Sequence, residues 1–383
     1  MKSYFTGLLV FLAAFIFFVI SPATCQANET YIGNAQIQEE ELAIGRIVNV
    51  GKEQLNAELL KGTGMRSSEQ IVQVKVLDGI LRGRTFEIKH EITDNPAFNI
   101  KVAPNQEVVL AISKQPNNQS EVSIADYHRM PVIGWLIVVF LAFFLFFGRM
   151  QGVKALLGLI ITVLLISGVL LPLSMRGVNP LLTAIGICLV STASIVLLIG
   201  GFSKKSVAAI SGTVGGVVVA GVTAQLVIWF APLTGLSSEE AQILRGSVLV
   251  QSPEFYSGLL AAGMLIGALG VIMDVGISIA SSVSEISKSN DMLTFKELYQ
   301  AGMNVGRDIM GAMTNTLILA YAGSALPLML LATQIAPNKL VNLDLFATEV
   351  ASALSGSLGL VVTIPITAFT AAKMMSQNKS NNE

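Results

Sequence analysis

Charge is what this sequence has least of. Asp, Glu, Lys and Arg make up only 13% of its 383 residues, while hydrophobic residues make up 52%. A soluble domain usually carries about 25% charged residues, so the composition excludes an ordinary soluble protein and predicts an integral membrane protein. The formal net charge of −1 averages a polar first third with an apolar remainder, so it indicates neither a nucleic-acid partner nor an acidic one.

Cysteine and histidine are also scarce. Cys25 lies near the end of the first apolar run and Cys188 inside another, so the sequence offers neither a disulfide framework nor a thiolate metal site. His90 and His128 both lie in the polar first third, without a second ligand at metal spacing. The apolar part contains no histidine and no Gly-x-Ser-x-Gly motif, which argues against intramembrane zinc or serine hydrolysis. We therefore expect no metal, no cofactor and no enzymatic activity.

The N-terminal segment has the pattern of an export signal. Lys2 precedes an apolar run over residues 5–20, and small residues follow at 21–27. This order is typical of a secretory signal peptide, and we predict one over residues 1–27. An uncleaved N-terminal anchor is the alternative.

Residues 28–130 are polar and alternate between apolar and polar side chains, which is typical of half-buried strands. About five short strands over this length predict a small antiparallel barrel or sandwich, OB-like by analogy. Basic residues are balanced by acidic ones, and the segment lacks aromatic residues interleaved with the basic ones for base stacking, so we expect no nucleic-acid binding. The expected strands are 43–50, 71–76, 84–89, 106–112 and 121–125.

Residues 131–373 contain about seven apolar runs, each long enough to cross a bilayer as a helix. The fold class that follows is an all-α polytopic membrane bundle behind a small β-rich domain. The runs are 131–147, 153–172, 180–200, 207–231, 256–282, 309–333 and 349–372.

The connections between the runs predict the orientation. One alternate set holds most of the basic residues, and the other holds only Arg176, Arg245 and Lys339. Because Lys and Arg collect on the cytoplasmic side, residues 28–130 are expected outside the cell and the polar tail, 374–383, inside.

Small residues recur at helical spacing in several runs. Such stripes let helices approach closely in lipid, where packing rather than hydrophobicity drives association. They also permit, without requiring, a homo-oligomer. The glycines we expect at helix contacts are Gly212, Gly216, Gly263, Gly267, Gly270 and Gly356.

Asp274 is the residue that most needs explaining. It lies about 12 Å from the end of its run by helical rise, too deep for its short side chain to reach water. A charge in hydrocarbon costs at least roughly 2.5–3.5 kcal/mol, so an intramembrane carboxylate is a functional hypothesis. Asn315, about 10 Å into the next run, lies at a similar depth and could meet it between the helices. Ser278, Thr314 and Tyr321 would complete a polar lining.

The other charges of this region have simpler explanations. We expect Glu285 and Arg307 at the cytoplasmic edge, and Asp308 as the N-terminal cap of the sixth span. Thr294-Phe295-Lys296-Glu297 has the form of a capping box and predicts a separate short helix on the cytoplasmic surface. A purely structural role for Asp274, paired with Arg307 or with hydroxyls, is an alternative. A catalytic Asp274–Asp308 pair is disfavoured because it needs a shift of roughly 10 Å.

Two long motifs carry a family resemblance. Residues 263–275 read GMLIGALGVIMDV, and residues 302–311 read GMNVGRDIMG, followed by NTLILAYAG at 315–323. With the leader, the β-rich segment and the multi-span part, they resemble the YibE/YibF family of bacterial multi-pass membrane proteins. The resemblance implies a cell-membrane location and transport as the usual suggestion, and it supplies no catalytic residue.

Two functions follow from these features. The first is a permease for an ion or small solute, proton-coupled through Asp274, with the lipid bilayer and the solute as its partners. The alternative is a membrane-anchored scaffold or sensor whose external β-domain binds a partner. Replacing Asp274 should abolish transport by a permease and should leave the function of a scaffold or sensor unaffected.

Overall fold

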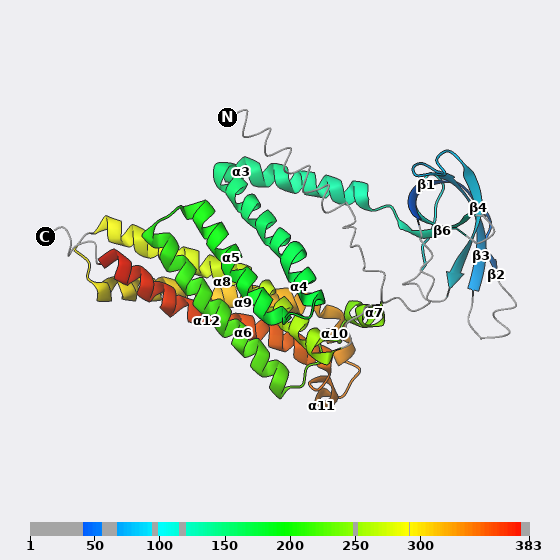
Figure 1. Cartoon of the computed structure of the whole chain (residues 1–383). Coiled ribbons are helices and arrows are strands. Elements are labelled where there is room, and N and C mark those ends of the chain that lie inside the picture. The colour runs from blue at the N-terminus through cyan, green and yellow to red at the C-terminus, as the bar shows by residue number, and fades with distance from the viewer. Residues whose placement is uncertain are drawn as a thin grey trace. The chain divides into compact units, whose positions relative to one another are not determined.

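The computed structural model describes residues 41–55, 67–93, 99–114, 120–247, 252–290 and 292–376. The expected signal peptide, 1–27, and residues 377–383 of the expected cytoplasmic tail lie outside these ranges. The chain divides into two compact units between Phe146 and Phe147, one built on strands and the other on helices (Figure 1).

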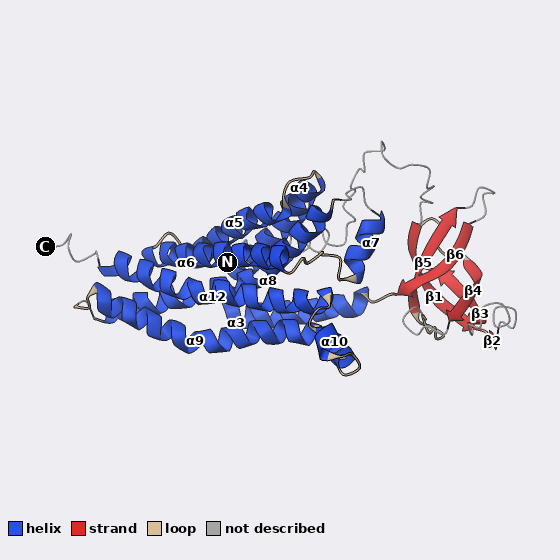
Figure 2. Cartoon of the chain, turned by 90° about the horizontal axis from the view of Figure 1, so that it is seen from below, coloured by secondary structure: helices blue, strands red, loops and turns tan. Residues whose placement is uncertain are grey.

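The first unit is an antiparallel sheet that curls into a half-barrel (Figure 2). Its strand order is β2-β3-β1-β5-β6, with β4 also paired to β3, and β4 lies close to β6 across the opening. A barrel was one of the two architectures expected, and all five expected strands are present. The strands are β1 (Glu41–Val50), β2 (Gln54–Leu55), β3 (Ser67–Val76), β4 (Thr85–Thr93), β5 (Glu107–Lys114) and β6 (Ser120–Tyr127).

Alternating side chains fill the half-barrel. Alternate residues of β1, β3 and β5, such as Ile47, Val74 and Leu110, are buried, which is the period-2 pattern of a sheet with one wet face. Gly45 allows β1 to bend over this core, because an added Cβ would lie 2.5 Å from Leu110 Cδ1. The core is therefore specified by the same alternation that predicted the strands.

The second unit is helical, and the first leg of α3, residues 130–146, belongs to the unit that contains the strands. Five described stretches are long and apolar enough to cross a membrane, or six if the bent pair α9 and α10 counts as one span, so the chain is a multi-pass membrane protein. The helices are α3 (Met130–Leu165), the π-helix η2 (Ile166–Leu170), α4 (Leu171–Met175), α5 (Pro180–Gly200), α6 (Lys204–Phe230), α7 (Glu239–Ser247), α8 (Pro253–Ser289), α9 (Phe295–Ser324), α10 (Leu326–Ala332), α11 (Pro337–Leu340) and α12 (Asp344–Ser376).

Two of the expected spans form one long stretch, Met130–Met175. Its backbone leaves helical geometry at Arg149, where φ is 46° and ψ is −132°, so α3 consists of two legs joined by a kink. The expected runs 131–147 and 153–172 lie on either side of that kink.

Helix α9 corrects two expectations. The capping box of Thr294 and Glu297 is present, but the helix it starts continues for 30 residues to Ser324. The prediction of a separate short helix on the cytoplasmic surface is therefore wrong. The expected capping role of Asp308 is wrong too, since that residue lies inside α9 and not at its N-terminus. The helix continues because Leu298, Gly302 and Gly306 are buried against the bundle.

Helix α9 ends at Ser324, where the chain bends. Helix α10 is bent by 70° from α9, and Pro327 lies in its first turn, where a proline lacks only an amide that has no helical partner. The sixth expected span, 309–333, therefore includes this bend.

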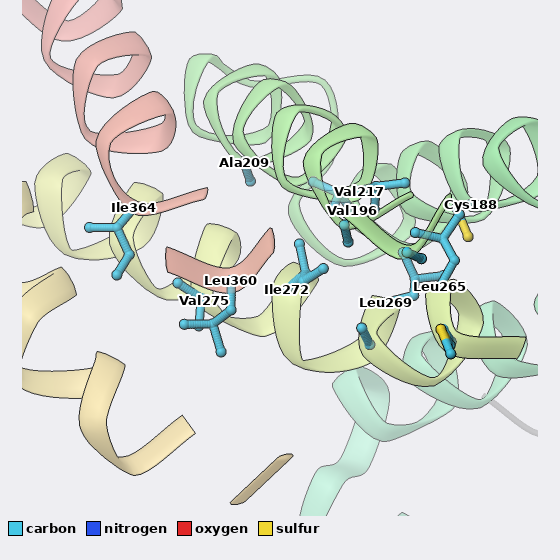
Figure 3. Close-up of a cluster of buried hydrophobic side chains, with 14 of the residues drawn as sticks. Cys188, Val196, Ala209, Val217, Leu265, Leu269, Ile272, Val275, Leu360 and Ile364 are labelled. Atoms are coloured by element: carbon cyan, nitrogen blue, oxygen red, sulfur yellow. The ribbon is translucent and has the colours of Figure 1, made fainter. Parts of the chain in front are cut away.

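Helix α12 is the centre of the bundle, packing against α6, α8 and α9. Apolar side chains from α5, α6, α8 and α12 meet in one cluster there (Figure 3). Among those labelled in the figure are Val217 of α6, Ile272 and Val275 of α8, and Leu360 and Ile364 of α12.

Candidate functional site

Helices α6 and α12 meet along what we call the glycine seam, formed by Gly212, Gly216, Gly359, Thr363 and Thr367. A Cβ added at Gly212 would lie 1.7 Å from Thr367 Oγ1, and one at Gly216 would lie 1.9 Å from Thr363 Oγ1 and 2.6 Å from the Gly359 carbonyl oxygen. Only residues without a side chain allow the two backbones to approach so closely. The seam is therefore a packing surface.

The hydroxyls of the seam are satisfied by their own helix. Thr363 Oγ1 donates to the Gly359 carbonyl at 2.9 Å, and Thr367 Oγ1 donates to the Thr363 carbonyl at 2.8 Å. Ser352, Ser355 and Ser357 also donate to the carbonyl four residues earlier. Helix α12 consequently looks polar in sequence but presents few free groups to a solute.

Helix α8 carries a different stripe of small and polar residues, all exposed within the single chain. An added Cβ would meet no atom within 4 Å at Gly263 or Gly270, whereas one at Gly356 of α12 would lie 2.8 Å from Leu317 Cδ2. The helix contacts expected at those two α8 glycines are thus not made by the residues that the structure describes. We call this stripe the carboxylate face; it consists of Gly263, Gly267, Gly270, Asp274 and Ser278.

Asp274 stands at the centre of this face without a partner. Among the residues that the structure describes, it forms no hydrogen bond and no ion pair, and the same holds for Arg307. The structural alternative, in which Asp274 pairs with Arg307 or with a hydroxyl, is not seen. An unpaired carboxylate at this depth has to face something polar outside the packed core of the bundle.

Helix α9 runs antiparallel to α8 and borders the carboxylate face. An added Cβ would lie 2.9 Å from Val283 at Gly302, 3.3 Å from Ile279 at Gly306, and 2.7 Å from the Tyr321 hydroxyl at Gly267. Continuing this register places Asp274 level with residues 311–314.

Thr314 is the α9 residue that turns toward Asp274. It lies seven residues, or two turns, before Tyr321, so both side chains share the side of α9 that borders α8. The Thr314 hydroxyl oxygen is buried, and no described residue bonds to it. Asp274, Ser278, Thr314 and Tyr321 therefore form one polar row along two helices.

Asn315 does not join this row. Successive helical residues are about 100° apart, so Asn315 points away from the side that Thr314 shares with Tyr321. It is exposed, and within the described ranges no hydrogen bond connects it to Asp274. The expected meeting of Asp274 and Asn315 between the helices is therefore absent.

Glu349 of α12 extends the row and was not singled out by the sequence. An added Cβ would lie 2.1 Å from Ile364 Cγ2 at Gly306 and 2.8 Å from Leu317 Cδ2 at Gly356, and this antiparallel register of α9 and α12 places Glu349 near the level of Tyr321. The sequence signal was an acidic residue at the start of an apolar run, which is easily taken for a span boundary. Its neighbour in space, Tyr321, becomes evident only once α9 and α12 are packed together.

Three further charges lie on α8 and α9. Glu285 forms an exposed ion pair with Lys288 at 2.8 Å, near the end of α8. Arg307 and Asp308 are consecutive residues of α9, about 18 and 20 Å from its start by helical rise. Both are exposed within the chain.

A carboxylate with partners occurs in the half-barrel. Glu107 accepts a hydrogen bond from Arg46 at 2.7 Å, and its other oxygen lies 3.0 Å from His128 Nδ1. The Arg46 hydrogen bond, followed by that of His128, holds the pKa of Glu107 below its usual value. The described residues include no group of three His, Cys, Asp or Glu side chains arranged to hold a metal ion.

Comparisons with known proteins agree with this architecture. The family model described as YibE/F-like protein matches residues 136–377, and the one described as YibE/F family N-terminal domain matches residues 40–127. Searches of curated proteins and of solved structures returned no match. The two matches cover the helical unit and the half-barrel respectively.

Proposed function

The chain belongs to the YibE/F family, and we propose that it is a permease for an ion or small solute, coupled to protons through Asp274. The single observation that carries the proposal is a carboxylate on an open face of α8, level with a hydroxyl of α9, both without a partner among the described residues. Ionisable groups inside membranes are costly and mark ion and proton pathways.

The topology we propose has seven spans. The stretch Met130–Met175 is about 69 Å long by helical rise, more than twice the roughly 30 Å of a bilayer core. The kink at Arg149 allows it to cross twice, and α9 with α10 crosses once. The distribution of basic residues then supports a half-barrel outside the bacterial cell membrane and a C-terminus inside, with residues 1–27 as the export signal.

The polar row supplies the chemistry of coupling. Asp274 takes up a proton from one side and becomes neutral, which lowers the cost of exposing its face to lipid. Its ionised form attracts a cation, while the hydroxyls of Ser278 and Thr314 provide oxygen ligands or hydrogen bonds to the solute. Tyr321 and Glu349 continue the row toward the end of the bundle where α8 begins.

Proteoliposomes test the proposal. Purified protein is reconstituted around a trapped pH dye and challenged in turn with inorganic cations, anions and small organic acids. At least one solute should move protons, and Asp274→Asn should lower that flux at least tenfold while the purified protein keeps its melting temperature. Glu285→Gln, a carboxylate change on the same helix, is the matched control and should retain the flux.

Normal flux in Asp274→Asn, or no flux with any solute, contradicts the proposal. A scaffold or sensor is the alternative, because the half-barrel is a separate compact unit. That function requires a cellular phenotype lost on deletion of residues 28–130 and unaffected by Asp274→Asn.

A further inference from the structure

A second polar stripe lies on α9, turned away from Thr314 and the carboxylate face. Its residues recur at alternating steps of four and three, and all are exposed within the chain. An average step of 3.5 residues is the repeat of helices that pack side by side in a coiled-coil manner. We call this stripe the asparagine line; it consists of Asn304, Asp308, Gly311, Asn315 and Ile318.

The asparagine line is poorly suited to face lipid. It carries two amides and a carboxylate, and Arg307 lies directly beside it. None of these four side chains has a hydrogen-bond or ion-pair partner among the described residues. Asn315 lies inside the expected sixth span, 309–333, where an amide without a partner is costly, so we expect another polar surface to cover the line.

The other apolar segments of this chain lack the groups needed to cover it. Residues 5–20 and 131–147 contain no charged side chain and no Asn or Gln. Either segment would leave Arg307 and Asp308 without a counter-charge. A second copy of the chain, in contrast, presents both signs of charge and the same two amides.

We propose that the asparagine line is the interface of a homodimer, with the two α9 helices parallel about a two-fold axis normal to the membrane. Such an axis brings each residue of the line near its own copy, so the paired Asn304 and Asn315 amides can bond across it. Asp308 is itself in the line, at the place of an a residue, and Arg307 precedes it at the place of a g residue. In a parallel pair the a residue of one helix packs into a hole that the g residue of the other helix borders, so the partner's Arg307 lies beside Asp308 and offsets the repulsion between the two Asp308 carboxylates.

Gly311 is placed to let the helices meet. An added Cβ there would find no atom within 4 Å, so the glycine has no packing role inside the chain. At the centre of the line it allows close backbone approach between the copies. Asp274, Ser278 and Thr314 are not part of this interface, whereas Arg307 lies two turns before Thr314 and therefore on the edge between the line and the carboxylate face. Association of the copies is measured separately from flux, so the two proposals can fail independently.

Cysteine cross-linking in native membranes tests the position of the axis. On a Cys25→Ser background, with buried Cys188 retained, Gly311→Cys should form a disulfide-linked dimer on mild oxidation. Gly186→Cys on α5 is the matched control, because that glycine also meets no atom within 4 Å, and it should stay monomeric. Equal cross-linking of the two variants overturns the proposal. So does a Gly311→Cys disulfide formed within one chain to Val138→Cys.

Charge reversal tests the pairing. Two differently tagged copies are co-expressed, and the fraction that co-purifies is measured by quantitative blotting. Arg307→Asp should lower this fraction at least fivefold, because two carboxylates then meet, and adding Asp308→Arg should restore it. Lys205→Asp on α6 is the control and should change nothing. Unchanged co-purification of a monodisperse Arg307→Asp protein overturns the pairing, whatever the transport assay shows.

Discussion

The glycine seam and the carboxylate face are built from the same kinds of residue and behave in opposite ways. Along the seam, glycines of α6 touch α12, and the α12 hydroxyls are bonded to their own backbone. On the carboxylate face, two glycines touch nothing and the acid has no partner among the described residues. Small and polar residues therefore mark both closed contacts and open surfaces in a membrane bundle.

The difference lies in which groups are left unsatisfied. A threonine hydroxyl can bond to the carbonyl one turn earlier, so it adds little polarity to a packed helix. An aspartate has no such local solution in hydrocarbon. Of the polar residues in a span, the carboxylate is thus the better indicator of a functional surface.

The largest effect should come from adding one methyl group at the seam. Gly216→Ala should lower the free energy of unfolding by about 1–3 kcal/mol, because the new Cβ meets backbone that cannot rotate away. Gly270→Ala is the control and should be neutral or stabilising, since alanine is a better helix former by about 0.8–1 kcal/mol. Unfolding in mild detergent, followed by circular dichroism, measures both.

Equal losses in the two variants would break the comparison. They would mean that the carboxylate face is as tightly packed in the folded protein as the seam. Equal gains in the free energy of unfolding would mean that α6 and α12 can move apart without cost, and that the seam glycines are not needed for packing.

Two threonines near the seam should respond with opposite signs to the same change. Thr213 is fully buried and its hydroxyl has no partner among the described residues, so Thr213→Val should stabilise the protein by about 1 kcal/mol. Thr363→Val removes a hydroxyl bonded to the Gly359 carbonyl and should destabilise it by about 0.5–1.5 kcal/mol. The same unfolding assay compares them. A loss at Thr213 would show that its hydroxyl is bonded after all.

The smallest effect should come from a carboxylate that has partners. The pKa of Glu107 is lowered in the folded state, so its contribution to stability is present above the usual carboxyl pKa and is lost as pH falls through the folded value. Arg46→Met should weaken the half-barrel by no more than about 1 kcal/mol at pH 7, since the pair is partly exposed. The difference from the unchanged protein should shrink at acidic pH.

Hydrogen exchange of β1 and β5 in the full chain, measured at pH 7 and near pH 3.5, checks this. An effect of the same size at both pH values would mean that Arg46 acts through packing and not through the charge of Glu107. The comparison between Glu107, whose charge has partners, and Asp274, whose charge has none among the described residues, would then not hold.

The level of Asp274 along the helices was predictable from the sequence, but the directions in which the side chains of α9 point were not. Counting residues placed Asp274 near the level of Asn315, and the packing of α8 on α9 places it level with residues 311–314. Which of Thr314 and Asn315 faces α8 depends on the rotation of α9, and that is set by Gly302 and Gly306 against neighbouring helices. The sequence therefore identified the acid and named both Thr314 and Asn315 as its lining, but it could not show which of the two faces α8.

The strands and apolar runs were predictable because each depends on a local pattern. The alternation of the half-barrel and the length of the runs are readable within one segment. Helix α9 was mistaken at its start because burial of Leu298, Gly302 and Gly306 by other helices extends it past the capping box without a break. Glu349 was missed for a similar reason, since its neighbour Tyr321 comes from another helix.

The hydroxyls of α12 have a mechanical consequence. Since they bond to their own helix, a single described side-chain hydrogen bond, from Ser211 to Thr370 at 3.0 Å, ties α12 to α6. Sliding or tilting of α12 against α6 would break that one bond and otherwise be resisted by side-chain packing, including the fit of glycine against threonine. Steric contacts of this kind can re-form one turn further along, as in the shear motions of packed helices. The tightest contact in the bundle is thus also one along which two helices can shift while nearly all their hydrogen bonds stay intact.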